Sequence, residues 1–153
     1  MNKDNTVLYL SYDGILEPLG RSQVLAYLEK ISSENQIYLI SFEKKTDLQD
    51  SNLVKKIQAI CLANDIVWNP LTYHKEPTFF ATIFDILNGF LNAIFYVIKY
   101  SVNVIHIRSY IPGLMVCVLT ALLNKKLIFD MRGFWADEKA DRADWNRQGN
   151  TYR

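Results

Sequence analysis

Residue types that carry chemistry are scarce in this sequence. Its 153 residues include two cysteines, two histidines and six glycines, and Cys61 and Cys117 each stand alone in an apolar helical pattern. Because no CxxC pair and no Cys/His cluster is present, a disulfide scaffold and a structural zinc site are both excluded. Two isolated thiols in apolar surroundings are typical of a protein in a reducing compartment.

An excess of charge of either sign is also missing. The chain carries 17 Lys and Arg against 16 Asp and Glu, a net charge of +1. A nucleic-acid binder depends on a basic footprint, so we expect no nucleic-acid partner. The first residues lack the basic start, apolar stretch and small-residue cleavage site of a signal peptide, and we expect a cytoplasmic protein.

The common motifs of nucleotide and hydrolase chemistry are absent too. The sequence contains no GxGxxG, no GxxxxGK[ST] and no GxSxG, which excludes a dinucleotide fingerprint, a P-loop and the nucleophile elbow of α/β hydrolases. The acidic run within 137–144 is interleaved with Lys and Arg, so it predicts a solvated charged face rather than a metal site. We expect no metal and no tightly bound cofactor.

What the sequence does contain is a regular alternation of strand-like and helix-like segments. The strand-like runs are nearly continuous in apolar residues, which is typical of a parallel sheet covered on both faces by helices. We therefore predict an open parallel α/β sheet in one domain over residues 1–135, and a charged tail with a short helix over 136–153. The expected strands are 6–12, 36–42, 65–68, 103–107 and 126–131, and the expected helices are 22–34, 48–64, 79–100 and the segment that follows Pro112.

The helix expected over 79–100 is unusual, because Asp85 and Lys99 are its only charged residues. It is long enough to span a bilayer. Asp85, Asn88, Asn92 and Lys99 nevertheless form a narrow polar stripe beside a very wide apolar remainder. Three interpretations stay open: a crossover helix packed on the sheet with a second face left over, a helix lying at a membrane interface, and a membrane span.

Ligands of open parallel sheets bind at the carboxyl ends of the strands, so the loops there hold the candidate site. In the loop 13–21, Gly14 and Gly20 permit tight turns and a close backbone approach. Free amides and the following helix N-terminus suit a phosphate or a sugar hydroxyl, and Arg21 adds positive charge. An ordinary strand-to-helix connection is the alternative.

Two further loops follow the fourth and fifth strands. Arg108 and Ser109 fall at the carboxyl edge, where a guanidinium can bind phosphate through two hydrogen bonds. His106 lies deeper and is expected to be a hydrogen-bonded core residue rather than a catalyst. Asp130 and Arg132 follow the fifth strand on the same side, and either pair with each other or contact a ligand.

Three blocks in this order carry a family resemblance: VLYLSYDGILEPLGRSQVLAYLEKIS, VIHIRSYIPGL and KLIFDMRGFWADE. Together they resemble the N-terminal domain of family 4 glycosyltransferases of the GT-B fold, over positions of about 6 to 142. The resemblance implies a Rossmann-like domain that binds the acceptor while a sugar moves, with retention, from a nucleotide-sugar donor to a glycan or lipid-linked acceptor. It also implies a nucleotide-sugar-binding domain as partner, in cis or in trans, and peripheral contact with the inner face of the membrane.

By this resemblance, the loop from Gly14 through Gly20 to Arg21 approaches the donor phosphates. Residues after the fourth and fifth strands line the interdomain cleft, namely Arg108, Ser109, Asp130 and Arg132. The donor is a co-substrate, so no other cofactor is implied.

The sequence departs from the family in three ways. Many relatives have a second glycine where Arg21 stands and a histidine where Arg108 stands, and the family's pair of glutamates in the donor domain is absent. The chain therefore resembles a truncated enzyme and is expected to be inactive alone. Two alternatives remain: a non-catalytic module that docks a partner domain or membrane through its apolar helix, and half of another two-domain sugar-nucleotide enzyme such as an epimerase.

Overall fold

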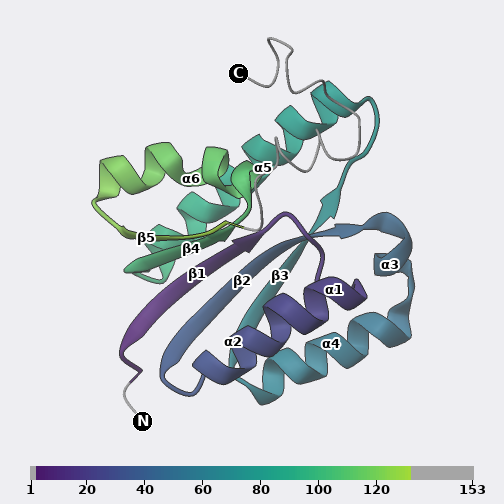
Figure 1. Cartoon of the computed structure of the whole chain (residues 1–153), viewed down its shortest axis with the longest axis horizontal. Helices are drawn as coiled ribbons and strands as arrows, with labels where there is room; N and C mark the ends of the chain where they lie inside the picture. Colours follow the sequence, from purple (N-terminus) through teal and green to yellow (C-terminus); the bar gives the residue numbers. More distant parts are fainter. Residues whose placement is uncertain (1–2, 132–153) are drawn as a thin grey trace, which may run out of the picture.

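The computed structural model describes residues 3–131 (Figure 1). The predicted tail over 136–153, its acidic run and the candidate site residue Arg132 lie outside the described residues. The strands are β1 (Asn5–Ser11), β2 (Asn35–Lys44), β3 (Ile66–Tyr73), β4 (Val104–Arg108) and β5 (Lys126–Asp130). The helices are α1 (Pro18–Gly20), the π-helix η1 (Arg21–Leu25), α2 (Ala26–Ile31), α3 (Lys45–Gln49), α4 (Ser51–Ala63), α5 (Thr78–Lys99) and α6 (Tyr110–Leu123).

The five strands form one parallel sheet in the order β3-β2-β1-β4-β5. In Figure 1, α1, α2 and α4 lie on one face of this sheet, whereas α5 and α6 lie on the other. The predicted α/β class, an open parallel sheet with helices on both faces, is therefore confirmed. The chain builds outward from β1 to β3 and then returns to the opposite side of β1 with β4, so the strand order reverses between β1 and β4.

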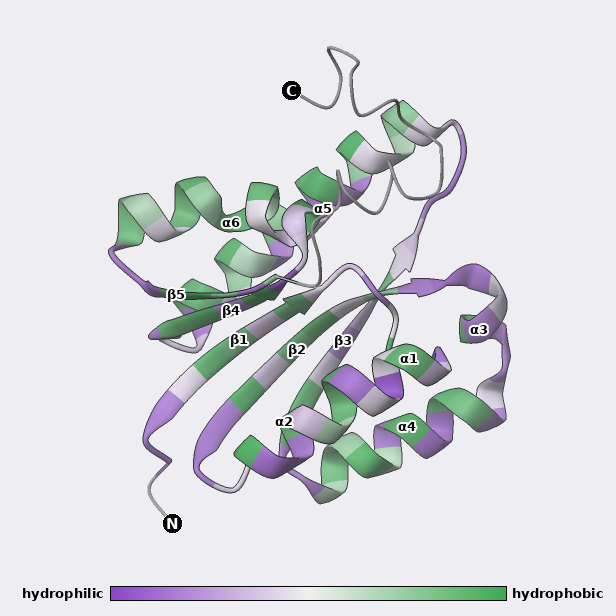
Figure 2. Cartoon of the chain, in the orientation of Figure 1, coloured by the Kyte–Doolittle hydropathy of each residue, from purple (hydrophilic) through white to green (hydrophobic). Residues whose placement is uncertain are grey.

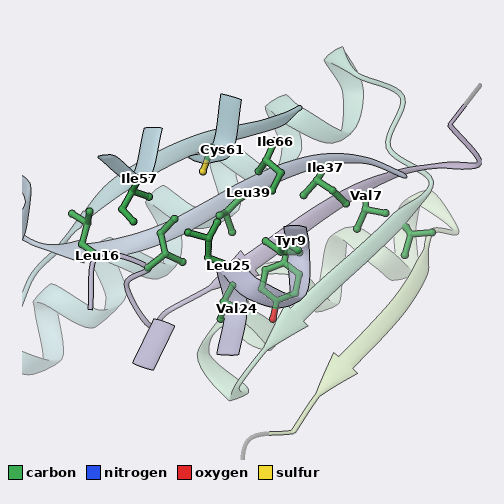
Figure 3. Close-up of a cluster of buried hydrophobic side chains, with 13 residues drawn as sticks. Val7, Tyr9, Leu16, Val24, Leu25, Ile37, Leu39, Ile57, Cys61 and Ile66 are labelled. Carbon is green, nitrogen blue, oxygen red and sulfur yellow. The ribbon is translucent and has the colours of Figure 1, made fainter. Parts of the chain in front are cut away.

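We call the side covered by α1, η1, α2 and α4 the sealed face. Side chains from four strands pack there against those helices, with Tyr9, Leu39 and Ile57 among the largest that are fully buried (Figure 3). The outer surface of α4 exposes polar side chains such as Lys55 and Lys56. This arrangement is that of ordinary amphipathic helices, with apolar residues inward and charge outward.

We call the side covered by α5 and α6 the open face, because its helices expose apolar side chains. The polar residues of α5 lie toward the sheet: Asp85 is fully buried, and the Asn92 side chain accepts a hydrogen bond from Asn69 Nδ2. Eight large apolar side chains of α5 are nevertheless 41–70% exposed, and Figure 2 shows hydrophobic bands along the helix. They are Phe79, Phe80, Ile83, Phe84, Leu87, Leu91, Phe95 and Ile98.

Helix α5 satisfies the length and composition of a membrane span, yet it packs on the sheet as a crossover helix, with 28% of its most apolar stretch buried. Gly89 makes this packing possible, since a Cβ there would lie 2.5 Å from Met115 Sδ on α6. Of the three interpretations of this segment, the structure shows the helix packed on the sheet with a second face left over.

Several predicted boundaries were wrong. The first helix begins at Pro18 rather than at residue 22, and the second helical segment divides at Asp50, whose carboxylate accepts the amide N–H groups of Asn52 and Leu53 and caps α4. The third strand continues through Pro70 to Tyr73. Proline is tolerated there because β3 is an edge strand, with a partner on one side only.

Helix α6 buries only part of its apolar surface. Met115 and Leu119 are buried, whereas Val118 and Leu122 are exposed. Helix α6 is apolar on most of its circumference, so its periodicity alone did not identify the side that faces the sheet.

Candidate functional site

The strand order reverses between β1 and β4, whose carboxyl ends lie side by side. In open parallel sheets this switch point is where ligands bind, because the loops leaving the two strands diverge to opposite faces. The loop after β1 contains Asp13 and Gly14, and the loop after β4 contains Ser109. The candidate residues from both loops therefore meet at one edge of the sheet.

The loop after β1 is built around a buried carboxylate, Glu43. Its Oε1 accepts the Ile15 amide at 2.9 Å, its Oε2 accepts the Leu16 amide at 3.0 Å, and Oε1 also accepts the Ser41 hydroxyl. Burial raises the pKa of Glu43, and these hydrogen bonds oppose the rise. Two of the loop amides expected to be free for a phosphate are therefore already bound to an internal anion.

Gly14 and Gly20, the two glycines predicted for this loop, each lie close to a neighbouring group where a Cβ would clash. A Cβ on Gly20 would lie 2.0 Å from the Gly14 carbonyl oxygen, and a Cβ on Gly14 would lie 2.4 Å from Glu43 Oε2. Gly20 belongs to α1 rather than to the loop, and Arg21 begins η1. The Arg21 guanidinium donates to the Leu16 carbonyl at 2.7 Å, so it closes the loop onto the helix.

Arg108 is the centre of the charged cluster at the switch point. Its side chain is nearly buried. Its Nη1 lies 2.6 Å from Asp130 Oδ2, and its Nε lies 3.8 Å from Asp13 Oδ2. Its Nη2 donates a hydrogen bond to Gln23 Oε1. The guanidinium thus joins the loop after β1, the first helical segment and the ends of β4 and β5. The Asp130 carboxylate pairs with Arg108, while Arg132, its predicted partner in the absence of a ligand, lies outside the described residues.

Beside this cluster lies a hollow of about 360 Å³ lined by Gln23, Tyr27, His106 and Asp130. The His106 ring packs 4.6 Å from the Tyr9 ring and edge-on to Tyr27. Burial lowers the pKa of His106; Asp130 acts in the opposite direction and Arg108 in the same one. A buried imidazole of this kind is neutral near pH 7 and offers hydrogen bonds rather than charge.

Ser109 adopts a backbone conformation that other residues avoid. Its φ of 77° and ψ of 170° fall in a region populated almost only by glycine. Its amide donates to the Asp130 carbonyl at 3.1 Å, and α6 begins at the next residue. The strained residue therefore ties the start of α6 to the end of β5, next to the Arg108 cluster.

Sequence reasoning missed the burial of the Glu43 carboxylate and the hydrogen-bond partners of the Asp85 carboxylate. The signal for Glu43 was alternation, since it continues the inward series of Ile37, Leu39 and Ser41 along β2. Asp85 accepts the Tyr12 hydroxyl at 3.0 Å and the His74 amide at 3.1 Å, and lies 2.7 Å from His74 Nδ1. No local pattern connects residues so far apart in the chain.

This arrangement is suited to holding polyhydroxylated ligands. Carboxylates such as Asp13 and Asp130 accept hydrogen bonds from sugar hydroxyls, and a fixed guanidinium donates them. Within residues 3–131 no group of three His, Cys, Asp or Glu side chains is arranged to hold a metal ion. The chemistry available at the switch point is therefore hydrogen bonding and charge.

Comparison with known proteins identifies similar folds among solved structures. No protein-family model and no curated protein sequence matches the chain. Among solved structures, a glycosyltransferase from Rickettsia africae superposes with a TM-score of 0.57 at 20% sequence identity, over 88% of this chain and 31% of the glycosyltransferase. The C-terminal domain of a hydrogenase from Pyrococcus furiosus superposes with a TM-score of 0.55 at 12% identity, over 86% of this chain and 94% of that domain. The chain thus has a Rossmann-like α/β fold that also forms part of a glycosyltransferase, and it spans about a third of that enzyme's length.

Proposed function

We propose that this chain is the acceptor-binding N-terminal part of a retaining family 4 glycosyltransferase of the GT-B fold. The observation that carries the proposal is the cluster of Arg108, Asp13 and Asp130, which sits at the switch point of the sheet. The strands within the three sequence blocks that resemble the family end at this same edge, at Ser11, Arg108 and Asp130. The fold shared with part of a glycosyltransferase supports the proposal at the level of architecture.

The proposed reaction needs more than this chain provides. Transfer of a glycosyl group requires fixed charges that stabilise a departing diphosphate and an oxocarbenium-like centre in a site shielded from water. This chain would form only one side of the proposed cleft, and one side alone does not shield the reacting groups from water. The proposed partner is a nucleotide-sugar-binding domain, in cis or in trans, and the proposed setting is polysaccharide synthesis at the cytoplasmic face of the membrane.

The test begins with the coding sequence beyond the Arg153 codon, where we expect a second Rossmann-like domain that carries the family's paired glutamates. The joined protein, or the two chains mixed, is then assayed with labelled nucleotide sugars, and the anomeric configuration of the product is followed by NMR. We expect transfer with retention, no turnover by the chain alone, and a loss of about a hundredfold or more in Arg108→Gln and Asp130→Asn.

Lys55→Gln, on the outer surface of α4, is the matched control and should keep full activity. Inversion at the anomeric carbon contradicts the retaining mechanism. Interconversion of the nucleotide sugar without an acceptor favours the epimerase-like alternative. Full activity of the Arg108 and Asp130 variants would show that the cluster at the switch point takes no part in the reaction.

The exposed apolar side of α5 favours a second function for the same chain, namely contact with a membrane surface. Its large side chains include Phe80 and Leu91, and Lys99 at the C-terminal end lies 4.9 Å from the Phe95 ring centre. Aromatic and aliphatic residues flanked by lysine are typical of helices that lie in a lipid interface. This contact is compatible with the proposed enzyme and also describes the non-catalytic alternative.

Vesicle flotation tests this contact. We expect the chain to float with anionic vesicles, and the double variant Phe80→Ser/Leu91→Ser to bind about tenfold more weakly. Leu62→Ser is the matched control, since Leu62 is equally exposed but lies on α4 of the sealed face. Flotation that does not change with the α5 variants would contradict the assignment.

A further inference from the structure

A second hollow, apart from the Arg108 cluster, opens at the carboxyl ends of β2 and β3. It has a volume of about 700 Å³, which is within the range of small-molecule sites. Three lysines, two threonines and a histidine line it, against one acidic residue: the lining consists of Lys44, Lys45, Thr46, Thr72, Tyr73, His74, Lys75 and Glu76. The lining of this hollow therefore has an excess of positive charge, although the whole chain is nearly neutral.

The histidine in this hollow is held by a buried group. His74 is tied to the fully buried Asp85 through both its backbone amide, at 3.1 Å, and its ring Nδ1, at 2.7 Å. The Phe84 ring stands perpendicular to the imidazole at 5.1 Å. With Nδ1 engaged, Nε2 is the ring nitrogen left for a ligand, and within residues 3–131 it makes no hydrogen bond.

We propose that this hollow binds the phosphate or diphosphate group of a ligand. Lysine ammonium groups bind phosphate as compact charges, a threonine hydroxyl donates a hydrogen bond to its oxygens, and an oriented imidazole adds direction. Thr72 is the threonine suited to this role, since the Thr46 hydroxyl donates to Asp47 Oδ1 at 3.1 Å. Lys44 is partly neutralised by Glu17, whose Oε2 lies 3.0 Å from Nζ, whereas Lys45 and Lys75 make no ion pair within the described residues.

The hollow adjoins a smaller hollow on one side and helix α5 on the other. A smaller hollow of about 230 Å³ shares Lys44 and Tyr73 with it and reaches Asp13 at the switch point. On the other side, Phe84 connects His74 to the exposed apolar side of α5. The phosphate can therefore belong either to a soluble phosphate ester or to the headgroup of a lipid whose chains follow α5, and the experiment separates these sources.

Calorimetric titration of inorganic diphosphate into the full chain tests the site directly. We expect saturable binding that becomes at least about tenfold weaker in Lys45→Gln/Lys75→Gln, because two charge-assisted contacts are lost. Lys55→Gln/Lys56→Gln on α4 is the matched control, with the same charge change outside the hollow, and should bind like the unmodified chain. Glu17→Gln should tighten binding by about two- to threefold, since it frees Lys44 from its ion pair.

Flotation with phosphatidylcholine vesicles, with and without phosphatidic acid, identifies the source of the phosphate. Vesicle binding that requires phosphatidic acid and is lost in Lys45→Gln/Lys75→Gln supports a lipid headgroup. Diphosphate binding without vesicle binding supports a soluble ester. Absence of diphosphate binding, or equal affinities in the hollow and control variants, overturns the proposal. None of these measurements depends on glycosyl transfer, so the site and the proposed function fail separately.

Discussion

The sealed and open faces of this sheet share the same strands but are covered in opposite ways. On the sealed face, α2 and α4 bury apolar residues and expose charge. On the open face, α5 turns Asp85 and Asn92 inward and leaves eight large apolar side chains exposed. An exposed apolar surface of this extent is typical of an interaction site. The comparison indicates that both faces bury an apolar core, and that the open face in addition presents an apolar surface for contact with something else.

The difference is sharpest at the polar groups that each face buries. Glu43, on the sealed face, binds two amides of a neighbouring loop and organises the backbone locally. Asp85, on the open face, joins the tyrosine that follows β1 to a histidine that follows β3, and so holds α5 by its polar side. Ala93, Tyr96 and Val97 on the inner side of α5 pack against the sheet as well, so the exposed apolar residues on its outer side are not needed for this attachment.

The largest difference between the faces is expected from truncating one apolar residue on each. Ile57→Ala removes a fully buried side chain and should lower the free energy of unfolding by about 4 kcal/mol, because it leaves a cavity. Leu91→Ala, on the exposed side of α5, should change it by less than about 0.5 kcal/mol. Urea unfolding followed by circular dichroism measures both. Equal losses would contradict the distinction between the faces.

Adding one methyl group at a glycine on each face should again change the stability of the domain differently, with a smaller difference than the truncations give. Gly20→Ala should cost about 3 kcal/mol, because its Cβ meets the Gly14 carbonyl and only backbone movement relieves the clash. Gly113→Ala on α6 meets only Ile107 Cδ1 at 3.5 Å, an ordinary contact, and should be neutral or stabilise by up to about 1 kcal/mol. Thermal melts of the two variants check this; a stable Gly20→Ala protein would show that the close approach is not required.

The buried carboxylate of the sealed face provides a third measurement. Glu43→Gln keeps the shape of the side chain but replaces one acceptor oxygen with a donor, so one of the two loop amides loses its partner, at a cost of about 2 kcal/mol. Amide exchange at Ile15 and Leu16 should become faster. Glu34→Gln, at an exposed position, is the control and should leave exchange in this loop unchanged.

The smallest expected effect is a dependence on pH that comes from His106, on the side of the sheet that carries the Arg108 cluster. Burial lowers its pKa in the folded chain. As the pH falls below about 6.5, the unfolded chain binds a proton that the folded chain does not, so stability decreases by about 1 kcal/mol over the next pH unit. His106→Phe should lose this component when unfolding is compared at about pH 7.5 and about pH 5.5. An unchanged pH dependence in the variant would assign it to other groups.

The sheet was predictable because its signals are local. Each strand is a short run of apolar residues, and continuous runs such as 36–42 occur only where both faces of a strand are covered. Juxtaposition of Arg108 and Asp130 also follows from local reasoning, since parallel β4 and β5 end at the same edge and pair these residues in register. The positions of the candidate residues at the switch point are therefore consequences of strand order.

The orientation of α5 was not predictable, because a polar stripe shows which residues share a face but not the direction that face takes. Its direction depends on Tyr12 and His74, which lie 73 and 11 residues from Asp85. The use of the first loop's amides by Glu43 depends likewise on a residue 27 positions beyond Leu16. Burial of charge is decided by such distant partners, and a window of neighbouring residues does not contain them.

The strand order also has a consequence for how the chain assembles. Where β1 and β2 begin, the Asn5 side chain donates a hydrogen bond to that of Asn35, 30 residues away in the sequence. Asn103, in contrast, accepts a hydrogen bond from the Thr6 amide across 97 residues. Contacts between nearby segments form sooner, and during synthesis the N-terminal segments are available first. We therefore expect β1, β2 and β3 to form with their helices while β4 is still being made. The central strand then serves as the template for both halves of the sheet, early on one edge and late on the other.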